Sequence, residues 1–190
     1  MDNPQERLRW LAGFIDGEGC FSLVEQQSGG KGSRHITPRV LVSNTNIDSL
    51  NYIIEILQHY EIAYYVGWRD PEKKTSGFAR PTGKWLWTIQ IAGAKRIARF
   101  LEVMLPYFIT KKQQAFTMYN WVKWVVERPR VIKNGDMNKY LETDRLVKQK
   151  ISELNKNPQR ADVEHQHTNI YVGDDVLRSN VRALESSRND

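Results

Sequence analysis

The sequence holds 190 residues, with 28 Lys and Arg against 22 Asp and Glu, a net charge of +6 and an isoelectric point of about 9.4. This length is enough for one domain with a buried core, and the single cysteine, Cys20, excludes an internal disulfide and fits a reducing compartment. No apolar run approaches the ~20 residues that span a membrane, and the first residues lack a secretory signal, so we expect a soluble, intracellular protein.

The first predicted element is a helix over residues 4–18. Asn3 is a suitable N-cap, Pro4 fits the first helical position, and Glu6 completes a capping-box spacing with Asn3. Apolar residues at i, i+3, i+4 and i+7 give the helix one face for the core, namely Leu8, Leu11, Ala12 and Ile15.

The end of this helix carries two acids, Asp16 and Glu18, where unpaired carbonyls already bear partial negative charge. We therefore expect a positive group there, and the oxygen ligands suit a hard ion such as Mg²⁺. Gly13 and Gly17 leave an adjoining face without side chains, which suits close packing against a second helix. An ordinary helix-stop turn over residues 17–19 with a solvated acid is the alternative.

Two strands follow, over residues 20–27 and 37–43, joined by a glycine-rich tip that carries Lys31 and Arg34. We expect Cys20 to be packed. Strict alternation divides the two strands into an inward set, Phe21, Leu23, Val40 and Val42, and an outward set, Ser22, Val24, Gln26, Arg39, Leu41 and Ser43.

The same pattern then repeats. Residues 44–48 supply caps for a helix with an apolar face of Leu50, Ile53, Ile54 and Leu57. A third strand over 63–69 and a fourth over 85–92 flank a loop rich in Pro, Gly and Lys. We expect Trp87, Ile89 and Ile91 to face inward, and Thr88 and Gln90 to lie beside the outward polar groups of the first strand.

Three further helices are predicted at about 94–105, 111–127 and 137–156, with Pro106 and Pro129 ending the first two. The order helix, two strands, helix, two strands, helices predicts an α+β fold of αββαββα type. Two antiparallel hairpins would form one sheet with helices on its back face and a polar front face.

We assign this domain to residues 1–156. Residues 157–190 contain four Arg against six acids and little apolar content, so we predict a polar tail that is partly ordered at best. His165 and His167 in the tail form a His-x-His pair, which we interpret as a surface pair, because no Cys or further His near it completes a metal site.

The positive charge is concentrated. Residues 69–112 hold ten Lys and Arg against three acids, a net of +7. Such a cluster favours a polyanion through counterion release, and a solvated basic surface is the alternative.

The nine residues 11–19 resemble the signature of the LAGLIDADG homing endonucleases, with Phe14, Gly17 and Glu18 in place of Leu, Ala and the second Asp. The resemblance implies a saddle-shaped sheet and two motif helices packed through their small residues. It also implies a divalent ion, Mg²⁺ or Mn²⁺, bound by Glu18 with help from the Gly17 carbonyl.

Two further catalytic positions follow from the resemblance. The segment 105–115 resembles the family's lysine region and places the catalytic lysine at Lys111; Asn46, at the end of the second strand, would hold the attacking water. Asn46 also suits a helix cap, and Lys111 with Lys112 also suits a phosphate clamp. Asp16 is expected to support the motif turn rather than to bind metal.

The motif occurs once, yet cutting both strands needs two centres, so we expect a homodimer on a roughly palindromic duplex. The expected interface comprises Leu11, Ala12, Gly13, Asp16 and Gly17. The expected DNA-binding residues are Ser22, Val24, Gln26, Lys31, Arg34, Arg39, Leu41, Ser43, Arg69, Lys84, Thr88, Gln90 and Lys112.

The favoured function is a Mg²⁺-dependent, site-specific double-strand DNA endonuclease encoded within an intron, in a prokaryotic cytoplasm or an organelle. An RNA-binding splicing maturase with the same fold is the alternative. Glu18 and Lys111, which a maturase does not need, favour the endonuclease, and they disfavour a non-catalytic DNA-binding regulator.

Overall fold

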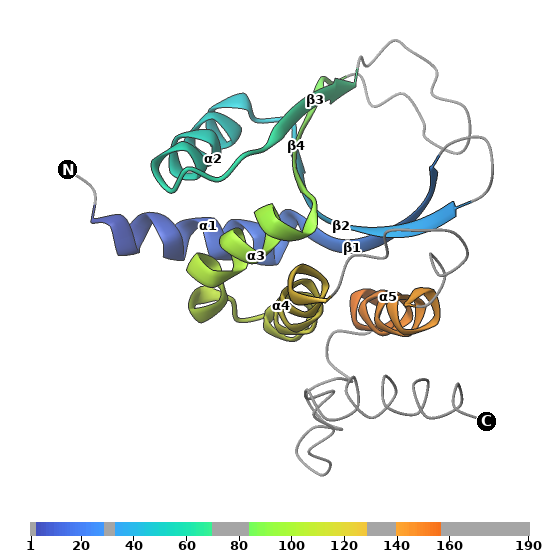
Figure 1. Ribbon diagram of the computed structural model, residues 1–190. Helices are drawn as coiled ribbons and strands as arrows, with labels where there is room; N and C mark the ends of the chain where they lie inside the picture. Colours follow the sequence, from blue (N-terminus) through green and yellow to red (C-terminus); the bar gives the residue numbers. More distant parts are fainter. Residues whose placement is uncertain (1–2, 29–32, 70–83, 129–139, 157–190) are drawn as a thin grey trace, which may run out of the picture.

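The computed structural model describes residues 3–28, 33–69, 84–128 and 140–156 (Figure 1). Expectations for Lys31, Pro129, the pair His165 and His167, and the tail over 157–190 fall outside these residues. The elements, in chain order, are α1 (Pro4–Glu18), β1 (Gly19–Ser28), β2 (Ser33–Asn44), α2 (Ile47–His59), β3 (Tyr65–Arg69), β4 (Leu86–Ala92), α3 (Ala94–Met104), the short 3₁₀ turn η1 (Leu105–Tyr107), α4 (Lys112–Glu127) and α5 (Leu141–Lys156). The predicted αββαββα order is confirmed.

The four strands form one antiparallel sheet in the order β1-β2-β4-β3. The sheet curls into an open trough, and the helices lie outside the curve (Figure 1). One expectation is wrong, because β4 pairs with β2 and not with β1. Thr88 therefore lies opposite Ser43, and Gln90 lies opposite Leu41. The third strand also begins two residues later than predicted, at Tyr65.

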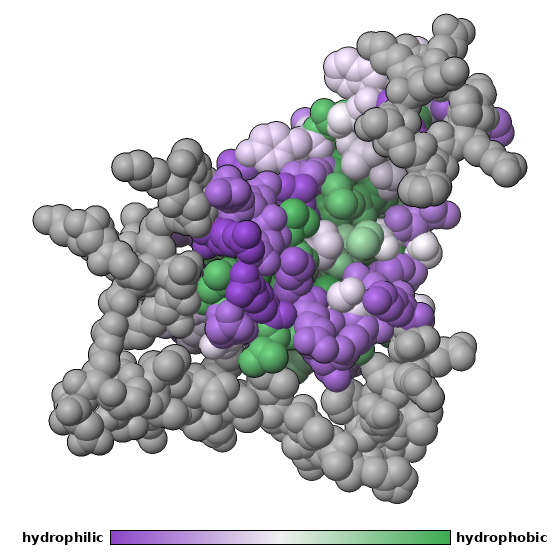
Figure 2. All heavy atoms as spheres, turned by 90° about the vertical axis from the view of Figure 1, so that its right-hand side faces the viewer, coloured by the Kyte–Doolittle hydropathy of each residue, from purple (hydrophilic) through white to green (hydrophobic). Residues whose placement is uncertain are grey.

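The core lies between the outer face of the sheet and the helices. The inward set from the first two strands is buried, as are Ile89 and Ile91 of β4, whereas Trp87 is only partly buried. The opposite, concave face carries the outward set. Figure 2 looks at the open side of the trough and shows a mainly hydrophilic surface with scattered hydrophobic side chains.

Helix α1 begins and packs as its sequence predicts. The Asn3 side chain accepts a hydrogen bond from the Gln5 N–H at 3.0 Å, and the Glu6 N–H donates to the Asn3 carbonyl at 2.9 Å. Its four predicted apolar positions are all buried. Among the described residues, no helix is both long and apolar enough to cross a bilayer.

Helix α5 is tied to the rest of the domain by buried polar contacts. Asp144, which is 4% exposed, accepts a hydrogen bond from Trp121 Nε1 at 2.8 Å and forms an ion pair with Arg128 at 3.0 Å. At the other end, Asn155 Nδ2 donates to the Phe21 carbonyl of β1 at 2.7 Å. The Asp144 contacts hold α5 against α4, and the Asn155 bond holds it against β1.

A cluster of charges adds to this contact. Glu25 of β1 lies 2.9 Å from Arg145 and 3.7 Å from Lys148, both on α5. The hydrogen bond from Arg145 lowers the pKa of Glu25 below its ordinary value of 4.5; burial opposes this shift, and the positive charges of Arg145, Lys148 and Arg34 add to it. The same contact raises the pKa of Arg145.

Candidate active site and nucleic-acid interface

The motif helix ends at a turn that is too crowded for a Cβ without a shift of its neighbours. Gly19 is the C-cap of α1, and its N–H donates to the Ile15 carbonyl. A Cβ on Gly19 would lie 2.6 Å from Ile15 Cγ2 and 2.7 Å from the Ile15 carbonyl oxygen. Helix α1 therefore passes directly into β1, and Glu18 stands at the junction.

Asp16 joins this junction to a segment more than ninety residues away in the sequence. Its Oδ2 accepts hydrogen bonds from the N–H groups of Ile109 and Thr110 at 2.9 and 3.1 Å, and its Oδ1 accepts one from Lys111 at 2.8 Å. The carboxylate thus holds the turn that precedes α4. This contact was not predicted, because nothing local in the sequence pairs these two segments.

Lys111 is the positive group expected at the end of α1. Its ammonium Nζ donates a hydrogen bond to the Asp16 carbonyl, one of the last carbonyls of the helix. A cation at this position offsets the negative end of the helix dipole. The side chain of Asp16 thus binds the backbone N–H of Lys111, and the main-chain carbonyl of Asp16 binds the Lys111 ammonium.

Glu18 and Gly17 are exposed at the same helix end. A carboxylate and a helix-terminal carbonyl are both hard oxygen ligands, which suit Mg²⁺. Within the described parts of the chain, no group of three or more His, Cys, Asp and Glu residues forms a metal cluster.

The end of β2 lies beside this junction. Gly19 pairs with Val42, so the last two residues of β2, Ser43 and Asn44, extend past it toward Glu18. Asn46 has the structural role that the sequence left open, since its Oδ1 accepts a hydrogen bond from the Ser49 N–H at 3.0 Å and caps α2.

Asn44 is a polar strand-end residue that sequence reasoning missed. Its Oδ1 accepts a hydrogen bond from the Asn46 N–H at 2.8 Å. The second strand was predicted to end at Ser43, with Asn44 among the caps of the next helix, whereas β2 runs to Asn44.

The concave face brings together most of the residues expected to meet DNA. Pairing across the sheet places Ser22 beside Arg39, Leu41 beside Gln90, and Ser43 beside Thr88. The Ser43 and Thr88 hydroxyls are hydrogen-bonded at 2.8 Å. By strand alternation the remaining expected residues on this face are Val24, Gln26 and Arg69.

Arg39 is unusual on this face because its Nε is buried without a hydrogen-bond partner among the described residues. Burial of an unpaired donor costs stability, and this atom is shielded from the trough, so any contact of Arg39 with a ligand has to be made by its terminal Nη groups.

Cys20 and Arg34 differ from expectation. Cys20 is exposed on the concave face, not packed, because the inward position next to it is taken by Phe21. Arg34 alternates with the inward residues of β2, and its Nη1 lies 3.5 Å from Glu25. Arg34 therefore belongs to the α5 side of the sheet. Lys84 and Lys112 are exposed, but neither lies within a strand.

The predicted contact face between copies is only partly available. Leu11 and Ala12 are 1% and 0% exposed in the chain's own core, which corrects their expected place in the interface, whereas Asp16 is partly exposed and stays a predicted interface residue. Gly13 and Gly17 are exposed, and a Cβ at either would meet nothing within 4 Å. The available surface is thus the glycine face of α1.

No protein-family model and no curated protein matches the sequence. Solved structures with a similar fold include homing endonucleases. I-CvuI, solved with its target in the presence of Ca, has a TM-score of 0.57 and 19% identity over 80% of this chain and 83% of its own. The LAGLIDADG enzyme I-GzeII, in complex with a DNA target, has a TM-score of 0.55 and 16% identity over 78% of this chain and 44% of its own.

A third structure, the homing endonuclease I-TnaI, has a TM-score of 0.51 and 13% identity over 84% of this chain and its whole length, 100%. These identities are too low to transfer individual residue roles, but each match covers more than three quarters of this chain. The chain has the fold of the LAGLIDADG homing endonucleases, the family that its nine-residue motif resembles.

Proposed function

We propose that this protein is a homodimeric, Mg²⁺-dependent endonuclease that cuts both strands of DNA at a specific site. The observation that carries the proposal is the bond pattern of Asp16, which brings Lys111 to the end of the helix that presents Glu18. An acid, a lysine and the polar end of β2 then meet at one edge of a hydrophilic trough.

The trough supports a duplex as the substrate. Arg39 and Gln90 lie on its face, and these side-chain types pair with guanine and adenine in the major groove. Arg39 is the candidate for guanine recognition because it lies on the concave face and its guanidinium can donate two parallel hydrogen bonds. Two structures with this fold, I-CvuI and I-GzeII, were solved in complex with DNA targets.

A second copy of the chain would supply the second catalytic centre. The exposed glycine face of α1 allows two helix backbones to approach closely, because no side chain stands between them. An isologous two-fold pairing through Gly13 and Gly17 would bring both Glu18 residues near the axis.

The oxygen atoms of Glu18 and Gly17 fit a magnesium ion, which when bound would polarise the phosphate and lower the pKa of a bound water. Lys111 would stabilise the negative charge that develops on the phosphate as water attacks and the P–O bond breaks. The amides at the end of β2, Asn44 and Asn46, would orient that water. Asp16 is a positioning residue, since it holds Lys111 in place.

The direct test is selection of cleaved sites from a randomised duplex library with Mg²⁺ and, separately, with Ca²⁺. We expect one long, roughly palindromic site to be cut with Mg²⁺ and to be bound without cutting with Ca²⁺. Recovery of no cleaved site, or cleavage without sequence preference, would contradict the proposal.

A further inference from the structure

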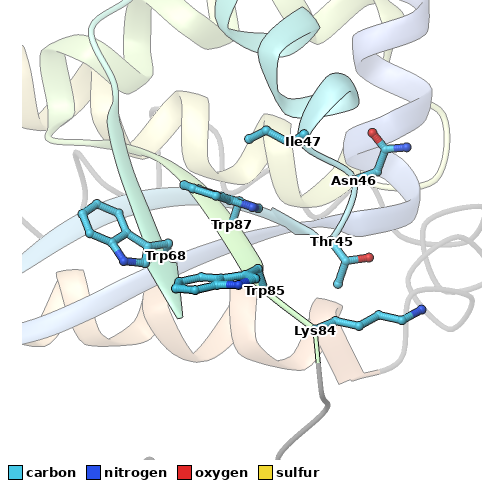
Figure 3. Close-up of a pocket in the computed structure, with 7 residues that line it drawn as sticks. All are labelled: Thr45, Asn46, Ile47, Trp68, Lys84, Trp85 and Trp87. Carbon is cyan, nitrogen blue, oxygen red and sulfur yellow. The ribbon is translucent and has the colours of Figure 1, made fainter. Parts of the chain in front are cut away.

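A hollow of about 800 Å³ opens at the end of the sheet nearest the candidate active site (Figure 3). Three indoles line it, Trp68, Trp85 and Trp87, together with Ile47 and the polar side chains of Thr45, Asn46 and Lys84. Only Asn46 among these has a part in the chemistry proposed above. The three tryptophans are half of the six in the chain.

The hollow exists because the apolar stripe of β4 continues beyond the cover of the helices. Ile91 and Ile89 are buried, Trp87 is partly buried, and Trp85 is 47% exposed. Trp68 of β3 lies opposite Trp87 and is 66% exposed. Alternation places Trp68, Trp87 and Ile89 on one face of the sheet, so an apolar surface that is core at one end of the strand is exposed at the other.

The indoles are arranged as a layered surface. The rings of Trp85 and Trp87 are nearly parallel, with centroids 6.3 Å apart and planes at 28°. Trp68 and Trp87 are 6.2 Å apart and tilted by 45°. In Figure 3 the Thr45 and Asn46 side chains lie on one side of this aromatic surface and Lys84 extends from its edge. Flat aromatic faces, a cation and small polar groups are the components of a nucleotide site.

We propose that this hollow binds an unpaired DNA nucleotide, whose base stacks on Trp68 and Trp85 while Lys84 neutralises a phosphate. Two observations favour DNA over an apolar partner: beside the indoles and Ile47 the lining includes a lysine and two polar side chains, and Asn46 places the hollow next to the candidate active site. The hollow opens on the helix-bearing face at the end of the sheet, so the unpaired nucleotide would lie outside the trough that holds the duplex. The inference rests on the DNA partner proposed above. It adds a strand that is locally unpaired to the substrate.

The test measures binding of a short oligodeoxythymidine to the full chain by quenching of tryptophan fluorescence. We expect quenching in the unaltered protein, and an affinity about tenfold lower in Trp68→Ala, because one stacked base is lost. Trp68→Phe should retain most of the affinity and Trp68→Leu should not, since a phenyl ring stacks whereas an aliphatic chain only buries apolar area.

Leu146→Ala is the matched control, because Leu146 is 61% exposed on α5, away from the hollow. We expect it to bind the oligonucleotide as the unaltered protein does. Because the Trp68 side chain is mostly exposed, its variants should keep the far-ultraviolet circular dichroism of the unaltered protein, and Trp68→Phe provides a second reading if Trp68→Ala does not fold.

The inference would be overturned if the oligodeoxythymidine did not bind or if Trp68→Ala bound it with unchanged affinity. It would also be overturned if an RNA oligonucleotide of matching sequence bound more tightly. A Trp68→Ala protein that lost a self-association seen in the unaltered chain would likewise overturn it. Duplex cleavage is measured separately. Trp68-dependent binding in a protein that cuts no duplex would refute the endonuclease and leave the nucleotide site standing.

Discussion

Asp16 is the residue on which the geometry of the candidate site depends. Its carboxylate accepts three backbone N–H groups, and its carbonyl accepts the Lys111 ammonium. The Asp16 carboxylate is thus engaged within the chain, as expected for a residue that supports the motif turn. Glu18, two residues later, is exposed, as the proposed metal site requires.

Asp16→Ala should therefore impair cleavage by releasing Lys111 rather than by removing a metal ligand. We expect the free energy of unfolding to fall by about 1–3 kcal/mol, because three N–H groups lose a charged acceptor. Cleavage should slow on the order of a hundredfold while DNA affinity changes little, since a small displacement of a catalytic group is enough. Denaturant titration, single-turnover cleavage and filter binding measure the three quantities.

The matched control is Asp48→Ala, which removes an exposed acid from the first turn of α2. Asp48→Ala should cleave at the unaltered rate. If Asp16→Ala also cut at that rate, Asp16 would have no positioning role.

The individual residues of this site were only partly predictable from the sequence. Glu18, Gly17 and Lys111 were identified from the motif and the lysine region, and the structure brings their segments together. Asn46 was ambiguous, because the same amide that suits a water also suits a helix cap, and the structure shows the cap. The contact of Asp16 with Lys111 could not be predicted, because it joins two segments far apart in the sequence and leaves no periodic pattern in either.

At the scale of elements, the junction of α1 and β1 depends on a single glycine. Gly19→Ala should destabilise the protein by about 1–3 kcal/mol, because a Cβ would overlap Ile15 and push the helix away from the strand. Gly67→Ala in β3 is the matched control, since a Cβ there would meet nothing within 4 Å. Denaturant titration of both variants measures the difference, and equal stability would show that the turn relaxes without cost.

The docking of α5 should respond to acid. The pKa of Glu25 is lowered by its hydrogen bond from Arg145, so the contact stabilises the protein above the ordinary value of 4.5 and is lost as the pH falls through the lowered pKa. We expect the denaturation midpoint of the unaltered protein to fall between about pH 5 and about pH 3.

Glu25→Gln should lower stability at neutral pH and show a smaller fall over the same range, because the amide does not titrate. Glu153→Gln is the matched control, because it makes the same substitution at an exposed position on α5. An identical pH profile for Glu25→Gln and the unaltered protein would mean that other acids cause the fall.

Helices and strands were predictable to within a few residues, because caps and periodicity are local. The pairing of β4 with β2 was not, since alternation fixes which side chains share a face but not which strand is the neighbour. Arg34 was misplaced for a related reason. The face of the sheet on which it lies depends on where β2 begins and on its register with β1, and not on the charge of the side chain.

At the scale of the whole molecule, the proposal requires two copies joined along α1. Gly13→Leu should fold, because the position is exposed and open, but should block the approach of a second helix. We expect a monomer by sedimentation equilibrium and loss of double-strand cleavage. Ser152→Leu places the same side chain at an exposed position on α5 and should remain dimeric. A dimeric Gly13→Leu protein would place the interface elsewhere.

The most direct test of the account is paired measurement of cleavage and binding by Glu18→Gln on the selected duplex with Mg²⁺. The amide keeps the size of the side chain but removes the charge that would hold the metal. We predict that Glu18→Gln binds the site with the affinity of the unaltered protein and makes no cut in either strand. Cleavage by this variant at the unaltered rate would contradict the account.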